Sequence, residues 1–176
     1  MANREALREL QSRLAGRLQT AHTQGTSVAW LAVRVGGNNL LFPLGQSGEI
    51  VPLGTPQSVP YVRTWFRGIS NIRGGLYGVV DLAAFLKESL GGDWTSSNMH
   101  EHSVITLNAS LEVNCALEVD SLLGLRGADA FTSTSPADPG APAYLGNQFL
   151  DTAGVQWQEI DLRILSQTPQ FLSISA

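Results

Sequence analysis

The chain has 176 residues, of which 43% are hydrophobic and only 15% are charged. This apolar content is enough for a core, and the low charge excludes an intrinsically disordered chain. The net charge of −4 and the presence of one lysine, Lys87, argue against a general binder of phosphate backbones, which needs clustered basic residues.

The sequence shows neither the pattern of a secretion signal nor that of a membrane-spanning helix. The first ten residues carry charges where a secretion signal needs an apolar run. No stretch approaches the roughly 18 apolar residues of a membrane helix. Cys115 stands alone, which excludes an internal disulfide and a cysteine-based metal cluster. We therefore expect a cytoplasmic protein without direct membrane insertion.

The N-terminal extension, residues 1–22, contains a predicted amphipathic helix over 3–20. Leucines recur there every three or four residues, which places them on one helical face. They are Leu7, Leu10, Leu14 and Leu18. This face could cover one end of the folded domain or dock on a partner.

The rest of the chain predicts a mainly β fold, because Val, Leu and aromatic residues gather in short runs bounded by Gly, Pro and Asn. The predicted strands are 27–35, 40–44, 49–53, 68–73, 76–81, 104–107, 112–119, 144–150 and 155–160. We place one hairpin turn at Gly74-Gly75 and another at 108–110. Short connecting helices are predicted at 82–90 and 162–165.

The remaining segments are polar. Residues 93–101 read as a linker, and 132–142 read as a mobile loop rich in Ser, Thr, Pro and Gly. The folded domain is expected to span 27–165, and residues 166–176 to form a C-terminal tail.

An internal echo suggests how this domain is organised. Residues 75–82 and 154–162 both read as a strand, then Asp-Leu, then an apolar helical start. The aspartates, Asp81 and Asp161, are 80 residues apart, close to half the chain. Two related small barrels are therefore predicted. Each aspartate is expected to cap the helix that follows it.

Catalytic signatures are weak. The sequence has no nucleophile elbow, phosphate-binding loop or dinucleotide fingerprint. His100 and His102 could share a strand face, but two ligands without a third make a poor metal site. Cys115 is expected to face inward with a raised pKa, which disfavours a nucleophile. We expect no metal and no cofactor.

Carboxylates offer an equally weak case for an enzyme. Three of them end apolar strands and one begins a strand, so a pair could meet across a groove as acid and base. They are Asp81, Asp120, Asp161 and Glu49. Turn formation and helix capping explain them more simply.

The most informative stretch is 65–82, which reads WFRGISNIRGGLYGVVDL. It resembles the signature of the CheW-like family: Trp, two residues, Gly, a hydrophobic residue, one residue, Asn, a hydrophobic residue, Arg-Gly and, further on, Asp-Leu. Residues 48–51 and 117–124 extend the resemblance, which runs from 27 to 165. Gly78 departs from the pattern, since the family often has Pro there. The Thr64-Trp65 entry, the Arg-Gly-Gly-Leu-Tyr run and the helical extension look more like the PilI branch, which serves twitching motility by type IV pili, than flagellar CheW.

Membership would imply two five-stranded SH3-like barrels with a groove between them. It would also imply a non-enzymatic adaptor that joins the cytoplasmic tip of a chemoreceptor to the regulatory domain of a CheA-type histidine kinase. The matching kinase-binding positions are Glu49, Ile50, Gly68, Asn71, Arg73 and Gly74. The matching receptor-binding positions are Val119, Asp120 and Leu122.

Two alternatives stay open at individual residues. Arg73 can contact a partner directly, or it can form an internal link that fixes the hairpin. Ile69 and Ile72 are expected in the core rather than at an interface.

A rival function is a small barrel that binds single-stranded nucleic acid. Such binding combines basic and aromatic side chains. The chain has one such cluster, formed by Arg63, Arg67, Arg73, Tyr61, Trp65 and Phe66. The negative net charge opposes this alternative.

Overall fold

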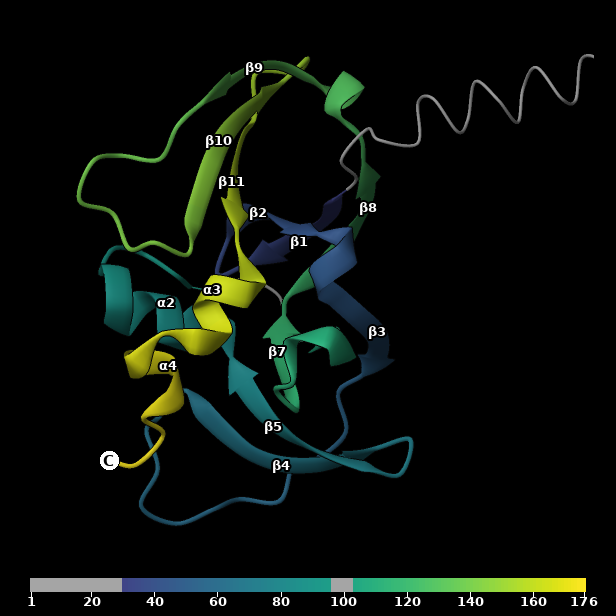
Figure 1. Ribbon diagram of the computed structural model, residues 1–176, viewed down its shortest axis with the longest axis vertical. Coiled ribbons are helices and arrows are strands. Elements are labelled where there is room, and N and C mark those ends of the chain that lie inside the picture. The colour runs from purple at the N-terminus through teal and green to yellow at the C-terminus, as the bar shows by residue number, and fades with distance from the viewer. Residues whose placement is uncertain (1–29, 96–102) are drawn as a thin grey trace, which may run out of the picture.

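The computed structural model describes residues 30–95 and 103–176. The helix predicted over 3–20 and the pair His100 and His102 lie outside these residues. Strands dominate the rest, in two mixed sheets stacked along the long axis of the molecule (Figure 1). The predicted mainly β class is confirmed.

Sheet A has six strands in the order β8-β1-β2-β11-β10-β9. They are β1 (Trp30–Val35), β2 (Asn38–Pro43), β8 (Ser121–Arg126), β9 (Phe131–Ser135), β10 (Leu145–Asp151) and β11 (Gln156–Ile160). Sheet B has five strands in the order β3-β6-β7-β5-β4. They are β3 (Ser47–Pro52), β4 (Phe66–Ile72), β5 (Gly75–Asp81), β6 (Ser103–Leu107) and β7 (Cys115–Val119).

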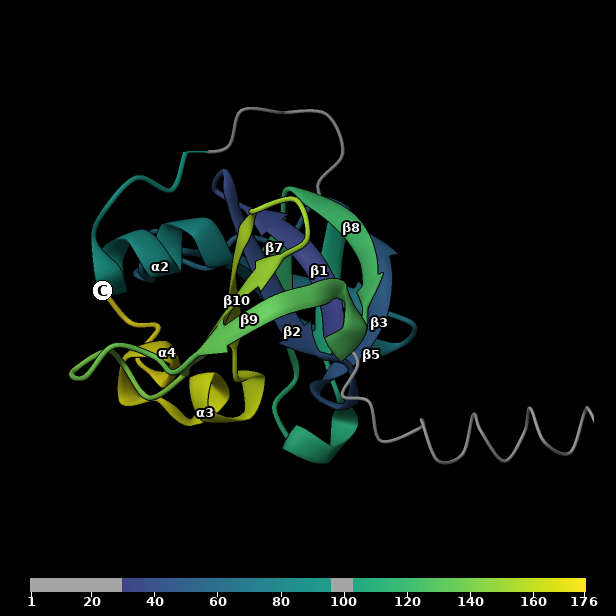
Figure 2. The ribbon, with the colours of Figure 1, turned by 90° about the horizontal axis from the view of Figure 1, so that it is seen from above.

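Three α-helices lie together on one side of the molecule in both views (Figures 1 and 2). They are α2 (Leu82–Leu90), α3 (Leu162–Gln167) and α4 (Pro169–Leu172). Single 3₁₀ turns connect other elements: η1 (Leu44–Gln46), η2 (Ala109–Leu111) and η3 (Ala128–Ala130).

The chain path interleaves the two sheets. It starts in sheet A with β1 and β2, builds all of sheet B, and returns to sheet A from β8 onward. The parallel pairing of β2 with β11 joins the early and late parts of the chain. The sheets are therefore not successive halves of the sequence, which corrects the expectation drawn from the echo.

The repeated sequence pattern does correspond to a local structure that occurs twice. In each copy, a buried aromatic residue precedes a hairpin, an aspartate and a helix. The amide of Asp81 donates to the carbonyl of Trp65 at 2.8 Å, and the amide of Asp161 donates to the carbonyl of Tyr144 at 2.8 Å. Each aspartate carboxylate also accepts from the amide three residues later, at 3.0 Å in both helices. The predicted capping is confirmed at both positions.

Each sheet curves around a small core of its own. Leu123 of β8 and Phe131 of β9 lie on opposite edges of sheet A, yet both pack against one cluster. Val51 of β3 and Ile72 of β4 do the same in sheet B. The curvature brings the two edges of each sheet toward one another.

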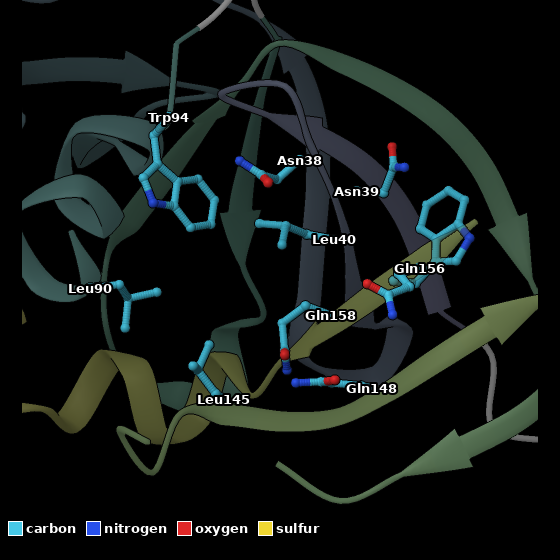
Figure 3. Close-up of a pocket in the computed structure, with 10 residues that line it drawn as sticks. Asn38, Asn39, Leu40, Leu90, Trp94, Leu145, Gln148, Gln156 and Gln158 are labelled. Carbon is cyan, nitrogen blue, oxygen red and sulfur yellow. The ribbon is translucent and has the colours of Figure 1, made fainter. Parts of the chain in front are cut away.

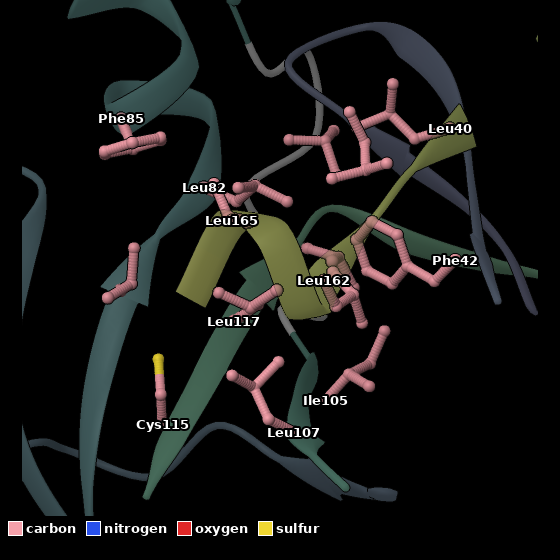
Figure 4. Packing of buried hydrophobic residues seen from close by; sticks show 14 of the residues in the cluster. Leu40, Phe42, Leu82, Phe85, Ile105, Leu107, Cys115, Leu117, Leu162 and Leu165 are labelled. Atoms are coloured by element: carbon pink, nitrogen blue, oxygen red, sulfur yellow. The ribbon is translucent and has the colours of Figure 1, made fainter. Parts of the chain in front are cut away.

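The largest hydrophobic cluster lies between the sheets and the helices. Side chains from both sheets meet those of α2 and α3 there (Figure 4). Phe42, Phe85 and Leu162 are all fully buried in it. This shared core makes the two sheets one folding unit.

Three local expectations differ from the structure. The first part of the 132–142 segment is not a loop but β9, an edge strand paired with β10. Ile69 is 39% exposed, because strand alternation places it on the outer face, whereas Ile72 packs against the sheet B cluster. Beyond residue 165, α4 buries Phe171 in the central core.

Candidate functional site

The tip of the β4–β5 hairpin is a tight two-residue turn. Ile72 pairs with Gly75, and the two residues between them, Arg73 and Gly74, have φ angles of 49° and 85°. Positive φ at both central residues is the geometry that matches the twist of a hairpin. Asn71 supports it, because its Oδ1 accepts from the Gly74 amide at 2.9 Å. The turn lies one residue earlier than predicted.

Arg73 reaches from this tip to the far edge of sheet B. Its Nε forms an ion pair with the carboxylate of Glu49 on β3. The side chains are 73% and 54% exposed. A pair this exposed contributes at most about 1 kcal/mol to stability. The internal link therefore exists, and both charged groups still face solvent.

Gly68 has a structural role inside the same hairpin. Its φ is +134°, and a Cβ added there would lie 2.1 Å from the Gln57 carbonyl oxygen. Gln57 and Ile69 exchange two backbone hydrogen bonds, of 2.8 and 2.9 Å. The β3–β4 connection thus runs along β4, and only glycine allows this close approach.

Two hollows lie beside the ion pair, and two exposed apolar residues lie close to it in the sequence. Ile50 is 45% exposed and Leu76 is 65% exposed. A hollow of about 430 Å³ is lined by Glu49, Arg73 and Tyr77, and one of about 260 Å³ is lined by Arg73 and Val51. A solvent-facing charge pair beside exposed aliphatic groups is typical of a protein-interaction surface.

The six predicted kinase-binding residues therefore fall into two groups. The side chains of Glu49, Ile50 and Arg73 are exposed. Gly68, Asn71 and Gly74 build the hairpin that carries Arg73. Leu76 was missed, although an apolar residue directly after a glycine turn could have indicated an exposed position.

The three predicted receptor-binding residues lie at the passage from sheet B to sheet A. Val119 is 1% exposed and belongs to the central core. The amide of Asp120 donates to the Arg34 carbonyl at 2.9 Å, which fixes the crossover. Leu122, on β8, is 38% exposed. Of the three, Val119 has no accessible side chain.

A further hollow of about 290 Å³ lies between the end of α2 and the outer face of sheet A (Figure 3). One wall is apolar and the other carries amide side chains. It is lined by Asn38, Asn39, Leu40, Leu90, Trp94, Leu145, Gln148, Gln156, Trp157 and Gln158. No charged side chain lines it, which suits an uncharged ligand or protein segment.

The arginines expected in a nucleic-acid site are occupied by carboxylates. Arg63 pairs with Glu88 at 2.9 Å, and Arg73 pairs with Glu49. Arg67 makes two hydrogen bonds to Glu118. Trp65 is completely buried, so it cannot stack on a base.

One further arginine–aromatic contact in the described part of the chain gives no basic patch either. Arg126 lies 5.5 Å from the centroid of the Trp157 ring, and Trp157 is 5% exposed. The nucleic-acid alternative is not favoured.

Groups suited to catalysis have other roles. Burial raises the pKa of the Cys115 thiol to about 12, which keeps it protonated and unreactive at neutral pH. Asp81 and Asp161 are helix caps. No group of three metal-ligating side chains occurs within residues 30–95 and 103–176.

The same part of the chain contains no helix that is long and apolar enough to cross a bilayer.

Comparisons with known proteins agree with the signature in β4 and β5. The family model for the CheW-like domain matches residues 29–162. Protein PilI of Pseudomonas aeruginosa is 29% identical over 126 residues, which cover 70% of this chain and 67% of PilI. The crystal structure of the scaffolding protein TtCheW from Thermoanaerobacter tengcongensis has a similar fold, with a TM-score of 0.63 and 16% identity over 82% of this chain and 96% of that one. The chain therefore belongs to the CheW-like domain family, and its similarity to PilI supports the PilI branch of that family.

Proposed function

We propose that this chain is a non-enzymatic, cytoplasmic adaptor that couples a chemoreceptor to a CheA-type histidine kinase in the control of type IV pilus twitching motility. Family membership and the similarity to PilI support the chemotaxis-type role. The observation that best supports a kinase contact is the exposed Glu49–Arg73 pair at the hairpin tip. Ile50 and Leu76, close to the pair in the sequence, are exposed as well.

Each curved sheet is also proposed to be an SH3-like barrel, as the family implies. In sheet B, the Gln57–Ile69 bridge and the Glu49–Arg73 pair both link the β3 side to the β4 side. In sheet A, the cluster shared by β8 and β9 supports the same description.

The kinase side is assigned to the exposed part of sheet B: Glu49, Ile50, Arg73 and Leu76. Charged groups that stay hydrated at an interface mainly set orientation and specificity, while buried aliphatic side chains supply affinity. The left-handed backbone of Arg73 supports a functional role for that residue, because non-glycine residues adopt it at a cost.

The receptor side is assigned to the crossover region of Asp120 and Leu122. Val119 contributes there through the packing beneath these residues. This surface lies on sheet A and the crossover into it, whereas the kinase side lies on sheet B, so one molecule can hold both partners at once.

A charge-swap experiment separates the partner contact of Arg73 from its internal link. The variants are Arg73→Glu, Glu49→Arg and the double swap, with Arg163→Glu on exposed α3 as the matched charge control. Affinity for the regulatory domain of a CheA-type kinase from the same organism is measured by calorimetry, after melting curves establish folding.

We expect Arg73→Glu to weaken kinase binding tenfold or more, because like charges across an interface repel. The double swap restores an ion pair within the chain, yet its kinase affinity stays low. Unchanged kinase affinity in a folded Arg73→Glu protein would exclude a direct contact between Arg73 and the kinase. Full recovery of kinase affinity in the double swap would mean that Arg73 acts only through its ion pair with Glu49.

A further inference from the structure

β8 is an edge strand whose two most exposed leucines share one face. Leu122 pairs with Val33, and Leu125 pairs with Leu31, on the neighbouring strand β1. Directly paired residues on antiparallel strands point to the same side of a sheet. Val33 and Leu31 both point into the central core, so Leu122 and Leu125 lie on that same side, at its rim.

A β-bulge produces this arrangement. In a regular strand, residues three apart point to opposite faces. The register between β1 and β8 shifts between Ala32 and Val33, which leaves Leu123 as an extra residue. Gly124 next to it has φ of +93°. Bulges of this kind re-aim side chains, and here the bulge turns Leu122 and Leu125 to one face.

The resulting surface, which we call the β8 leucine face, consists of Leu122 and Leu125. They are 38% and 63% exposed. Among the described strands, β8 pairs only with β1, so its outer edge has no strand partner there. An open strand edge with exposed leucines is a surface that proteins normally cover.

The chain preceding β1 starts beside this surface. Trp30, the first residue of β1, pairs with Arg126, which directly follows Leu125. The eleven residues 19–29 can span up to about 35 Å when extended, whereas the six residues of β8 span about 20 Å. The segment that carries Leu7, Leu10, Leu14 and Leu18 can therefore reach every part of the β8 leucine face.

Charge also favours this occupant. Residues 1–29 hold four arginines and two glutamates, a net charge of +2. The described residues hold seven basic and twelve acidic side chains, a net charge of −5. Asp120 directly precedes β8, and Asp129 follows it three residues after its end. A segment bound along β8 would thus bring the arginines that flank its leucines near a carboxylate at each end of the strand.

We propose that the leucines of residues 7–18 bind in cis to the β8 leucine face. A short tether gives the segment an effective concentration in the millimolar range, so a few apolar contacts suffice. The docking does not depend on the proposed adaptor function. If Leu122 also meets a receptor, the N-terminal segment competes with that receptor for the same surface.

Disulfide trapping in the full chain tests this proposal. The pair Leu14→Cys and Leu125→Cys is compared with the pair Leu14→Cys and Leu76→Cys, because Leu76 is 65% exposed but lies on sheet B. The native Cys115 is buried and does not interfere. Mild oxidation at low protein concentration is followed by non-reducing gels and mass spectrometry.

We expect the intrachain disulfide to form at least tenfold faster with Leu125→Cys than with Leu76→Cys. Equal rates would overturn the proposal. Disulfides mainly between chains would overturn the cis arrangement and identify a second copy as the occupant.

Hydrogen exchange of the full chain gives a second readout without cysteines. Replacing both Leu122 and Leu125 with Ser should speed amide exchange in residues 7–18 at least tenfold, while Leu76→Ser leaves it unchanged. Unaltered exchange in the folded double variant would contradict the docking.

Discussion

Arg67 on β4 binds Glu118 on β7 through both arms of its guanidinium, with Nε–Oε2 at 2.8 Å and Nη2–Oε1 at 3.2 Å. Glu118 is 4% exposed, whereas half of the Arg67 side chain faces solvent. The hydrogen bond that Arg67 donates to Glu118 raises the pKa of Arg67 above its usual value, against the lowering effect of partial burial. The pair joins two strands that have β5 between them.

Arg67→Ala should therefore lower the free energy of unfolding by about 2 kcal/mol. The change removes the two-armed partner of a buried carboxylate, and the solvent exposure of Arg67 reduces the loss below that of a fully buried pair. Urea titration provides the measurement. Arg67→Lys keeps the charge without the planar fork, so its free energy of unfolding should lie between those of the native chain and Arg67→Ala. Equal stability of Arg67→Ala and the native chain would refute this account.

Removal of either helix cap should cost about 0.5–2 kcal/mol. In Asp81→Ala and Asp161→Ala, the amides of Ala84 and Ile164 lose their carboxylate acceptors. The Asn variants keep an acceptor and serve as controls. Thermal unfolding of all four chains is compared, and an alanine variant as stable as its asparagine control would exclude capping at that site.

Gly68→Ala and Gly74→Ala test two different uses of glycine in one hairpin. At Gly68 the new methyl group would collide with the Gln57 carbonyl, so we expect a loss of about 3 kcal/mol or more. At Gly74 no atom lies within 4 Å of the added carbon, and the left-handed backbone alone should cost about 1 kcal/mol.

Both stabilities come from denaturant melts. Similar small losses at the two positions would mean that the β3–β4 connection moves away from Gly68 freely.

Cys115 should resist thiol reagents in the folded protein. With a pKa of about 12, about one thiol in 10⁴ is ionised at pH 8, compared with a substantial fraction in an unfolded chain. Because folding raises this pKa, its contribution to stability is complete below about pH 8.5 and declines as the pH rises toward 12. Reaction with a disulfide reagent at pH 8, with and without urea, provides the measurement. Rapid modification in native buffer would contradict this burial.

Much of the fold could be predicted because local chemistry determines it. Asp81 and Gly91 bound α2 as cap residues, and the prediction of 82–90 matches the helix. The alternation around Cys115 correctly predicted its burial. The interleaved sheets could not be predicted, because the pairing of β2 with β11 depends on contacts more than 100 residues apart.

The site was predictable at the level of a motif but not of geometry. The resemblance pointed to Glu49 and Arg73, but only the curvature of sheet B brings their side chains together. The position of the turn was missed by one residue, since Arg73 takes a backbone conformation that sequence patterns assign to glycine. The burial of Val119 depends on packing between the sheets.

The interleaved chain path also orders events during synthesis. The strands of sheet B all come from one stretch, 47–119, and become available for pairing once that stretch has left the ribosome. The strands of sheet A do not, because β1 and β2 must wait for β8 to β11, which are made much later. For much of translation the nascent chain therefore carries two apolar strands with no neighbours from the later part of their sheet, and α3 and α4 close the shared core only after residues 162–172 have emerged.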